Sequence, residues 1–179
     1  MTKIDGKGTT PQNYEVKNVT SFKGTEGYGY NASLYRNRTR IAFLIDTANG
    51  GEVDIQWLDS SQPKVDITHT VYREGGYKPY TFKGTPEEKI LYEHVDSLPI
   101  EPPTEEFPYE VKHTVNTFLG KLVEQYEINQ KIKQDCKNKT VVKVDETYFT
   151  YNQPFSPQFK QFLQEKNPNI TEFVNERFI

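Results

Sequence analysis

Short segments with alternating apolar and polar residues fill the first half of the chain. Residues 41–45 are apolar throughout, and residues 53–57 and 65–72 each alternate with the two-residue period of a strand. Asn49-Gly50-Gly51 supplies a tight-turn signal between the first two. Short strands joined by short turns pair with their chain neighbours, so the pattern predicts a mainly antiparallel sheet. In residues 41–45 both alternating sets are apolar, which predicts a strand buried on both faces.

Helix signals begin where this alternation ends. Thr85 can cap a helix, Pro86 suits its first position and Glu88 can complete a capping box, so a helix is predicted through residue 98. An apolar stripe at helical spacing predicts a longer helix over residues 109–137. Beyond it, the sequence predicts a β-rich segment over 140–151, a short helix from Ser156 and a last short helix over 173–178.

The order of these elements predicts the fold class and the domain organisation. We expect an α+β fold, with a mainly antiparallel N-terminal sheet and a helix, followed by a helical C-terminal part with a small β element. Residues 99–108 contain four prolines and three glutamates, which favours an extended linker or an acidic arm that lies along a partner. The predicted parts are a flexible N-terminus (1–13), an α+β subdomain (14–98), this linker and a mainly helical subdomain (109–179).

Composition excludes several classes of protein. With 22 Lys and Arg against 25 Asp and Glu, the net charge is −3, which argues against a polyanion binder driven by bulk charge. The single cysteine, Cys136, excludes an internal disulfide framework and a cysteine-based zinc site. The longest strictly apolar run is five residues, whereas a membrane span needs about 20. The N-terminal residues lack the apolar core of a signal peptide, so a cytoplasmic protein without membrane association is expected.

Catalytic and cofactor motifs do not emerge from the residues. His69 and His113 are each followed by Thr-Val, whereas two-histidine phosphoesterases need a hydroxyl residue two positions after the histidine. We therefore predict that these two histidines and His94 are packed and hydrogen-bonded. Cys136 has no histidine near it in sequence, so a catalytic thiolate is not expected. Because no P-loop or dinucleotide fingerprint is present, we predict a non-enzymatic protein with no cofactor.

A set of three polar residues keeps open the hypothesis of a small-molecule site. Asp54, Asp66 and Thr68 are predicted to project from the polar face of adjacent strands. Two carboxylates and a hydroxyl can hold Mg²⁺, which would suit a metal-dependent phosphate-ester site. A solvated sheet face shows the same alternation, so both interpretations stand.

The segment from residue 23 to residue 40 carries the best candidates for partner binding. It begins with a glycine-rich stretch whose tyrosines could stack on a base or fill a partner's pocket. It ends in an arginine-rich turn that could contact phosphates. Protein interfaces also favour tyrosine and arginine anchors, so a protein partner and a nucleic acid are both candidates. The candidate residues are Tyr28, Tyr30, Tyr35, Arg36, Arg38 and Arg40.

Two parts of the chain together resemble a family. The landmarks are residues 18–35, 41–46, 49–51, 57 and 97–99 in the first part, and residues 132–140, 154–157 and 175–178 in the second. Across residues 14–99 and 130–178, the chain resembles small uncharacterised proteins of bacteria and their phages. The turn Arg36-Asn37-Arg38 departs from the plainer Asp-Gly hairpin of such proteins. The resemblance implies a phage or mobile-element accessory protein that binds a host protein, for example one of a defence system.

Overall fold

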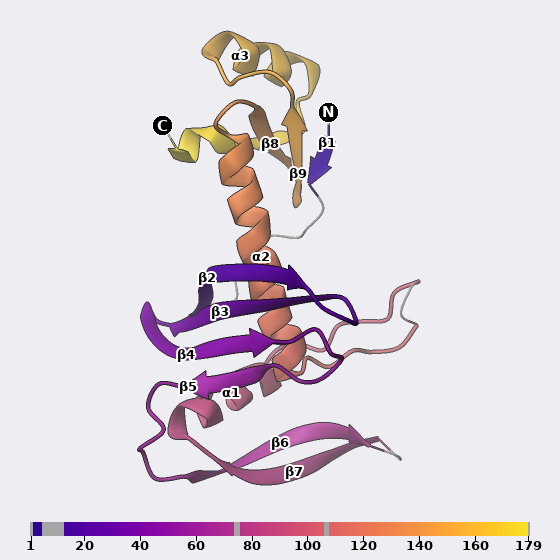
Figure 1. Ribbon diagram of the computed structural model, residues 1–179. Coiled ribbons are helices and arrows are strands. Elements are labelled where there is room, and N and C mark those ends of the chain that lie inside the picture. The colour runs from indigo at the N-terminus through magenta and orange to yellow at the C-terminus, as the bar shows by residue number, and fades with distance from the viewer. Residues whose placement is uncertain (1, 5–12, 74–75, 106–107, 179) are drawn as a thin grey trace. The chain divides into compact units, whose positions relative to one another are not determined.

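The computed structural model describes residues 2–4, 13–73, 76–105 and 108–178 (Figure 1). The chain divides into two compact units. The first comprises residues 13–122, and the second comprises residue 123 onward together with the N-terminal segment that contains strand β1. The division falls inside a helix, after Leu122, whereas the sequence analysis set its boundary at residues 99–108. Of the predicted flexible N-terminus, residues 1 and 5–12 lie outside the described residues.

An antiparallel four-stranded sheet forms the centre of the first unit. Its strand order follows the chain, and every neighbour is antiparallel, as the alternating pattern predicted. The turn between the second and third of these strands places Asn37 at φ 50° and Arg38 at φ 68°. Positive φ at both central residues matches the twist of a two-residue hairpin. The strands are β2 (Tyr14–Lys23), β3 (Tyr28–Arg36), β4 (Thr39–Asp46) and β5 (Asp54–Trp57).

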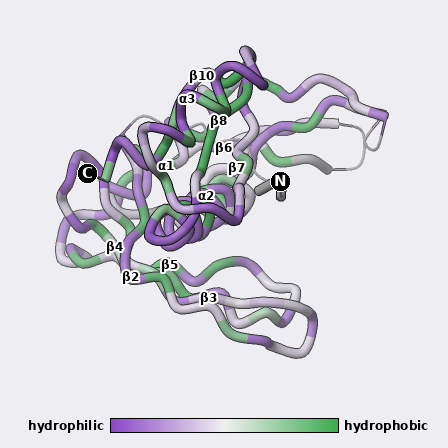
Figure 2. Tube along the Cα trace, turned by 90° about the horizontal axis from the view of Figure 1, so that it is seen from above, coloured by the Kyte–Doolittle hydropathy of each residue, from purple (hydrophilic) through white to green (hydrophobic). Residues whose placement is uncertain are grey.

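One face of this sheet is the core face. Leu34 pairs with Ala42, and Ala32 pairs with Leu44, so all four side chains lie on the same face, and each is 0% exposed. Helix α1 (Pro86–Asp96) and the part of α2 (Val115–Asp135) that belongs to the first unit, up to Leu122, lie on one side of the sheet in both views (Figures 1 and 2). The buried rings of Tyr14 on β2 and Phe118 on α2 meet edge to face at 5.6 Å, which identifies this side as the core face.

Helix α1 begins as its sequence signals predicted. The Thr85 hydroxyl accepts a hydrogen bond from the Glu88 backbone N–H at 3.1 Å, and the Glu88 carboxylate accepts one from the Thr85 N–H at 3.2 Å. This reciprocal pair is a capping box. Leu91 and Val95 on the helix are 0% exposed, so the helix is held by packing as well as by its cap.

Two further strands form a separate antiparallel ribbon in the first unit. Strand β6 (Val65–Arg73) pairs along its whole length with β7 (Gly76–Gly84). Helix α1 lies against β6, where Ile67 is 1% exposed. The sequence analysis named the first of these strands and missed β7, whose residues 77–81 are all exposed and show no apolar alternation.

The proline-rich segment forms a closed loop. Glu101 and Val111 exchange two backbone hydrogen bonds, of 2.9 and 3.0 Å, and so join the two ends of this segment in a β-bridge. Of the predicted linker, residues 99–108, Glu101 is held by this bridge, and Glu106 and Phe107 lie outside the described residues. Because residues 109–113 belong to this loop, α2 begins at Val115 and not at residue 109.

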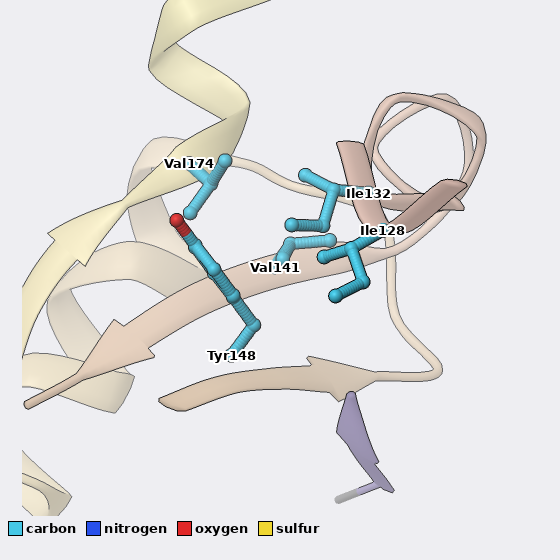
Figure 3. Close-up of a cluster of buried hydrophobic side chains, with 5 residues drawn as sticks. All are labelled: Ile128, Ile132, Val141, Tyr148 and Val174. Carbon is cyan, nitrogen blue, oxygen red and sulfur yellow. The ribbon is translucent and has the colours of Figure 1, made fainter. Parts of the chain in front are cut away.

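The second unit contains the small C-terminal sheet. Strands β8 and β9 form a hairpin; β10 pairs with β8, and the N-terminal strand β1 pairs with β9. A cluster of buried side chains from α2, β8, β9 and a short 3₁₀ helix, η1, fills its core (Figure 3). The bounds are β1 (Thr2–Ile4), β8 (Thr140–Val144), β9 (Thr147–Tyr151), α3 (Pro157–Lys166), β10 (Ile170–Phe173) and η1 (Val174–Phe178). The predicted α+β class is confirmed.

Candidate functional site

The six predicted binding residues do not form one patch. Tyr28 begins β3 and Arg36 ends it, so eight strand steps separate them, or about 27 Å. The glycine-rich stretch is also shorter than expected, because Tyr28 and Tyr30 lie in the strand and not in a loop. An extended strand thus divides the candidates between two distant ends of the sheet.

Two of the six residues are engaged within the fold. Tyr30 is 7% exposed, and burial, reinforced by the charge of Asp46, raises its pKa to about 12. Arg36 forms a two-pronged ion pair with Glu87 of α1, in which its Nη2 donates to Oε2 at 2.8 Å. The hydrogen bonds to Glu87 raise the pKa of Arg36. Tyr30 and Arg36 therefore serve the structure of the first unit.

The remaining four candidates stay accessible to a partner. Tyr28 is 77% exposed at one end of β3. Arg38 and Arg40 are exposed at the opposite end, beside the half-buried Tyr35. Neither arginine has an ion-pair partner among the residues that the structure describes. Tyr35, Arg38 and Arg40 therefore remain together as a candidate group.

The face of the β2–β5 sheet opposite the helices extends this group. Tyr35 pairs with Arg40, and Ser33 pairs with Phe43, so Tyr35 and Phe43 are diagonal neighbours on the two central strands. The Lys17 Nζ lies 4.7 Å from the centre of the Tyr35 ring, and the Arg40 guanidinium carbon lies 6.0 Å from that of Phe43. Within the first unit, no described element covers this side in either view (Figures 1 and 2). We call it the outer sheet face; its residues are Lys17, Phe22, Tyr35, Arg40, Phe43 and Ile45.

This face also corrects an expectation about β4. The sequence analysis predicted a strand buried on both faces, but only Ala42 and Leu44 are fully buried. Ile41, Phe43 and Ile45 are half-buried, because no second layer packs on them within the described part of the first unit. When only one face of a sheet is covered, apolar residues on both sides of a strand indicate that the uncovered face also carries an apolar surface.

A cavity of about 430 Å³ is the second candidate site of the first unit. It lies between β5, the β6–β7 ribbon and the residues that lead into α2. Three aromatic rings line it in succession: Tyr80 and Phe82 stack at 6.0 Å, and Phe82 meets Tyr92 edge to face at 5.1 Å. Sequence reasoning missed this site, because its walls come from segments separated by tens of residues.

His69 connects this cavity to a partly buried group of charges. Its Nδ1 lies 3.2 Å from both carboxylate oxygens of Asp96, and the Lys112 Nζ lies 2.9 Å from the same carboxylate. The ring of His69 also meets Tyr92 edge to face at 4.9 Å. The prediction of a packed, hydrogen-bonded histidine is confirmed for His69, which also lines the cavity.

The other two histidines and the cysteine are partly buried. His94 packs between Tyr14 and Phe118, its buried Nε2 has no partner among the described residues, and burial lowers its pKa. The prediction of a hydrogen-bonded ring is therefore wrong at that nitrogen.

His113 Nε2 lies 3.5 Å from Glu101, and burial is the largest cause that lowers the pKa of His113. Burial raises the pKa of Cys136 to about 11, so its thiolate is scarce at neutral pH.

The three residues of the metal hypothesis are not on adjacent strands. β5 and β6 belong to different sheets, so that premise is wrong. Asp54 accepts a hydrogen bond from Gln56, Asp66 pairs with Lys83 at 2.8 Å, and the hydroxyls of Thr68 and Thr81 lie 3.0 Å apart. Among the described residues, no group of three or more His, Cys, Asp or Glu side chains is placed to hold a metal ion.

Comparison of the chain with protein-family models, curated proteins and solved structures finds no match. In the part of the chain that the structure describes, no helix is long and apolar enough to cross a membrane. The functional assignment therefore rests on the two candidate sites and on their chemistry.

Proposed function

We propose that the chain is a non-enzymatic interaction protein that binds a partner protein through the outer sheet face. The single observation that carries this proposal is the uncovered pair of rings, Tyr35 and Phe43, on the two central strands. Partly exposed aromatic anchors flanked by arginine and lysine are typical of the energetic centre of a protein interface. The partner we propose is a host protein, such as a component of a defence system, met by a phage or mobile-element accessory protein in the cytoplasm.

The charge distribution on this face supports a protein partner. Lys17 pairs with Glu15 at 3.0 Å, and the side chains of Asp54 and Gln56 edge the face on β5. Positive and negative groups therefore alternate around the rings, as at the polar rim of a protein interface. The phosphate backbone of a nucleic acid favours a more uniformly positive surface.

Replacement of Tyr35 and Phe43 by alanine is expected to weaken partner binding by about 30-fold or more, because truncation of a central anchor costs about 2 kcal/mol. The tagged chain is first used to capture partners from bacterial lysate with and without nuclease. Affinity for the purified partner is then measured by calorimetry for the wild-type chain and for the double variant. Tyr28→Ala is the matched control, because it removes an exposed tyrosine from the same strand and leaves the outer sheet face intact.

The proposal is contradicted if the double variant keeps the affinity of the wild-type chain while Tyr28→Ala loses it. That result would place the interface at the end of β3 that carries Tyr28. Partners that disappear after nuclease treatment would also overturn a protein interface, and they would support the second candidate function.

That second candidate function is nucleic-acid binding at the hairpin end of the same face. The observation that favours it is the exposed, unpaired Arg38 beside Arg40 and Tyr35 in the described structure. Arginine can contact phosphates and tyrosine can stack on a base.

Arg38→Glu is expected to weaken binding to a labelled single-stranded oligonucleotide and to lower the salt dependence of the affinity. Each lost phosphate contact reduces the slope of log K against log salt by about 0.7 for a single strand. Fluorescence anisotropy over a salt series measures both effects, with Lys78→Met as a control for an exposed cation elsewhere in the first unit. An affinity that is independent of salt and of Arg38 would exclude this function.

A further inference from the structure

We propose that Asn49 is a site of spontaneous modification, at which the backbone nitrogen of Gly50 attacks the side-chain amide and ammonia is released. The chain contains a single Asn-Gly pair, and it lies in the loop that joins β4 to β5. Asparagine is among the thermolabile residues, and a glycine after it has no Cβ to hinder the approach of its nitrogen. The loop contributes no residue to the outer sheet face, so this inference does not depend on the proposed function.

The loop is anchored immediately before the reacting pair. The carbonyl oxygen of Ala48 accepts a hydrogen bond from the Glu26 N–H at 2.9 Å, and the Ala48 N–H donates to Asp46 Oδ1 at 2.8 Å. Ala48 is 7% exposed, whereas Asn49 and Gly50 are both exposed. The fold therefore fixes one end of the segment and leaves the reacting pair open to water.

Thr25 polarises the amide that is attacked. Its hydroxyl donates a hydrogen bond to Asn49 Oδ1 at 2.9 Å. That oxygen gains negative charge when a nucleophile adds to the amide carbon, and a donor already aimed at it stabilises this charge. The Asn49 Nδ2 group has no hydrogen-bond partner among the described residues, so the leaving nitrogen is not held in place there.

Gly50 supplies the nucleophile, and Glu26 lies beside it. The Gly50 N–H has no acceptor in the part of the chain that the structure describes. A Cβ added at Gly50 would collide with the Glu26 carboxylate, so this carboxylate lies directly against the glycine. A carboxylate in that place can accept the N–H proton as a general base. Gly50 also has φ 71°, a conformation that favours glycine.

The reaction consumes water and releases ammonia. The Gly50 nitrogen forms a bond to Asn49 Cγ, and its proton passes to Glu26. The bond from Cγ to Nδ2 breaks, and ammonia leaves with that proton, which closes a succinimide ring. Water then adds to either carbonyl of the ring and breaks its bond to nitrogen, so the product is aspartate or isoaspartate. No atom is oxidised or reduced, and the loop gains a negative charge near Glu26 and Asp46.

Mass spectrometry of the full chain tests this site. The chain is incubated at mildly alkaline pH in water labelled with heavy oxygen and is then digested with trypsin in ordinary water. The tryptic peptide of residues 41–64 contains Asn49 and no other asparagine. We expect Asn49 to take up the label at least about tenfold faster than the exposed Asn152, because Gln153 carries a Cβ beside the attacking nitrogen.

Two variants test the roles of the neighbouring side chains. Thr25→Val and Glu26→Gln are each expected to slow the loss of the Asn49 amide about threefold, because water replaces only part of a lost donor or base. The matched controls are Thr20→Val and Glu124→Gln, which change exposed residues elsewhere in the chain and should keep the wild-type rate. Circular dichroism checks that each variant is folded.

Two results would overturn the proposal. The first is an Asn49 amide that persists in the folded chain as long as that of Asn152. The second is a folded Thr25→Val or Glu26→Gln chain that loses the amide as fast as the wild type does. Tyr35→Ala with Phe43→Ala should leave this rate unchanged, so failure here is distinct from failure of the protein interface.

Discussion

Asn175→Ala is expected to lower the free energy of unfolding of the second unit by about 3 kcal/mol. Asn175 is 3% exposed, and its Oδ1 accepts a hydrogen bond from the Val141 N–H at 2.8 Å. Its Nδ2 donates to the carbonyl oxygens of Cys136 and Lys139, at 3.1 and 2.8 Å. One side chain therefore joins η1 to the end of α2 and to the start of β8. Alanine would leave these backbone groups without partners, and each unsatisfied buried group costs about 1–3 kcal/mol.

Urea unfolding followed by far-ultraviolet circular dichroism measures this loss. Asn152→Ala is the matched control, because Asn152 is exposed and its removal is expected to change the free energy of unfolding by less than about 0.5 kcal/mol. An equally small change for Asn175→Ala would mean that water replaces its three hydrogen bonds. Trp57, the single tryptophan, lies in the first unit, so its fluorescence should be unaffected by Asn175→Ala until that unit unfolds.

Leu44→Ala is expected to cost about 3 kcal/mol in the first unit, within the range of about 2–5 kcal/mol for leucine in a core. Leu44 is 0% exposed, and it lies between Ala32 and Ile55 on the core face of the sheet. The packed helices cannot collapse fully into the space that it leaves, which adds a cavity cost to the lost hydrophobic burial. Urea unfolding followed by the fluorescence of Trp57 on the adjacent strand measures the change.

The neighbouring residue provides the control for this prediction. Phe43 points to the outer sheet face and is half-buried, so Phe43→Ala is expected to cost about 1 kcal/mol while it weakens partner binding. Equal losses of stability for Leu44→Ala and Phe43→Ala would contradict the assignment of one covered and one open face.

Elements with strong local signals were predicted well. The capping residues Thr85 and Glu88 identified the start of α1, because a cap is formed by residues only three positions apart. The apolar run over residues 41–45 identified β4, because a short apolar run followed by a turn signal is typical of a strand. In both cases the information lies within a few neighbouring residues.

Elements that depend on distant partners were missed. β7 has few apolar residues, and it forms a strand because β6 supplies its hydrogen bonds. β10 pairs with β8, roughly 28 residues before it in the chain, and a residue window cannot show such pairing. The bridge between Glu101 and Val111 likewise could not be predicted, because it joins a residue of the proline-rich segment to a residue ten positions later.

The residues of the candidate sites could likewise be predicted only where they are close in sequence. Tyr35, Arg38 and Arg40 were named from the sequence and remain together, because a hairpin keeps near neighbours close. Phe43 joins them only through strand register, and Arg36 leaves them only because Glu87 of another element faces it. The cavity residues come from the β5 region, the β6–β7 ribbon, α1 and the start of α2, so no sequence motif identifies them.

The amino-acid sequence by itself therefore determined the α+β class, the start of α1 and the hairpin that carries the arginines, since these follow from short-range periodicity and capping. The tertiary structure decided which apolar side chains are covered, which charges are paired, and which distant residues share a cavity. The physical reason is that burial and pairing depend on contacts between segments far apart in the chain, and those contacts exist only after the chain has folded.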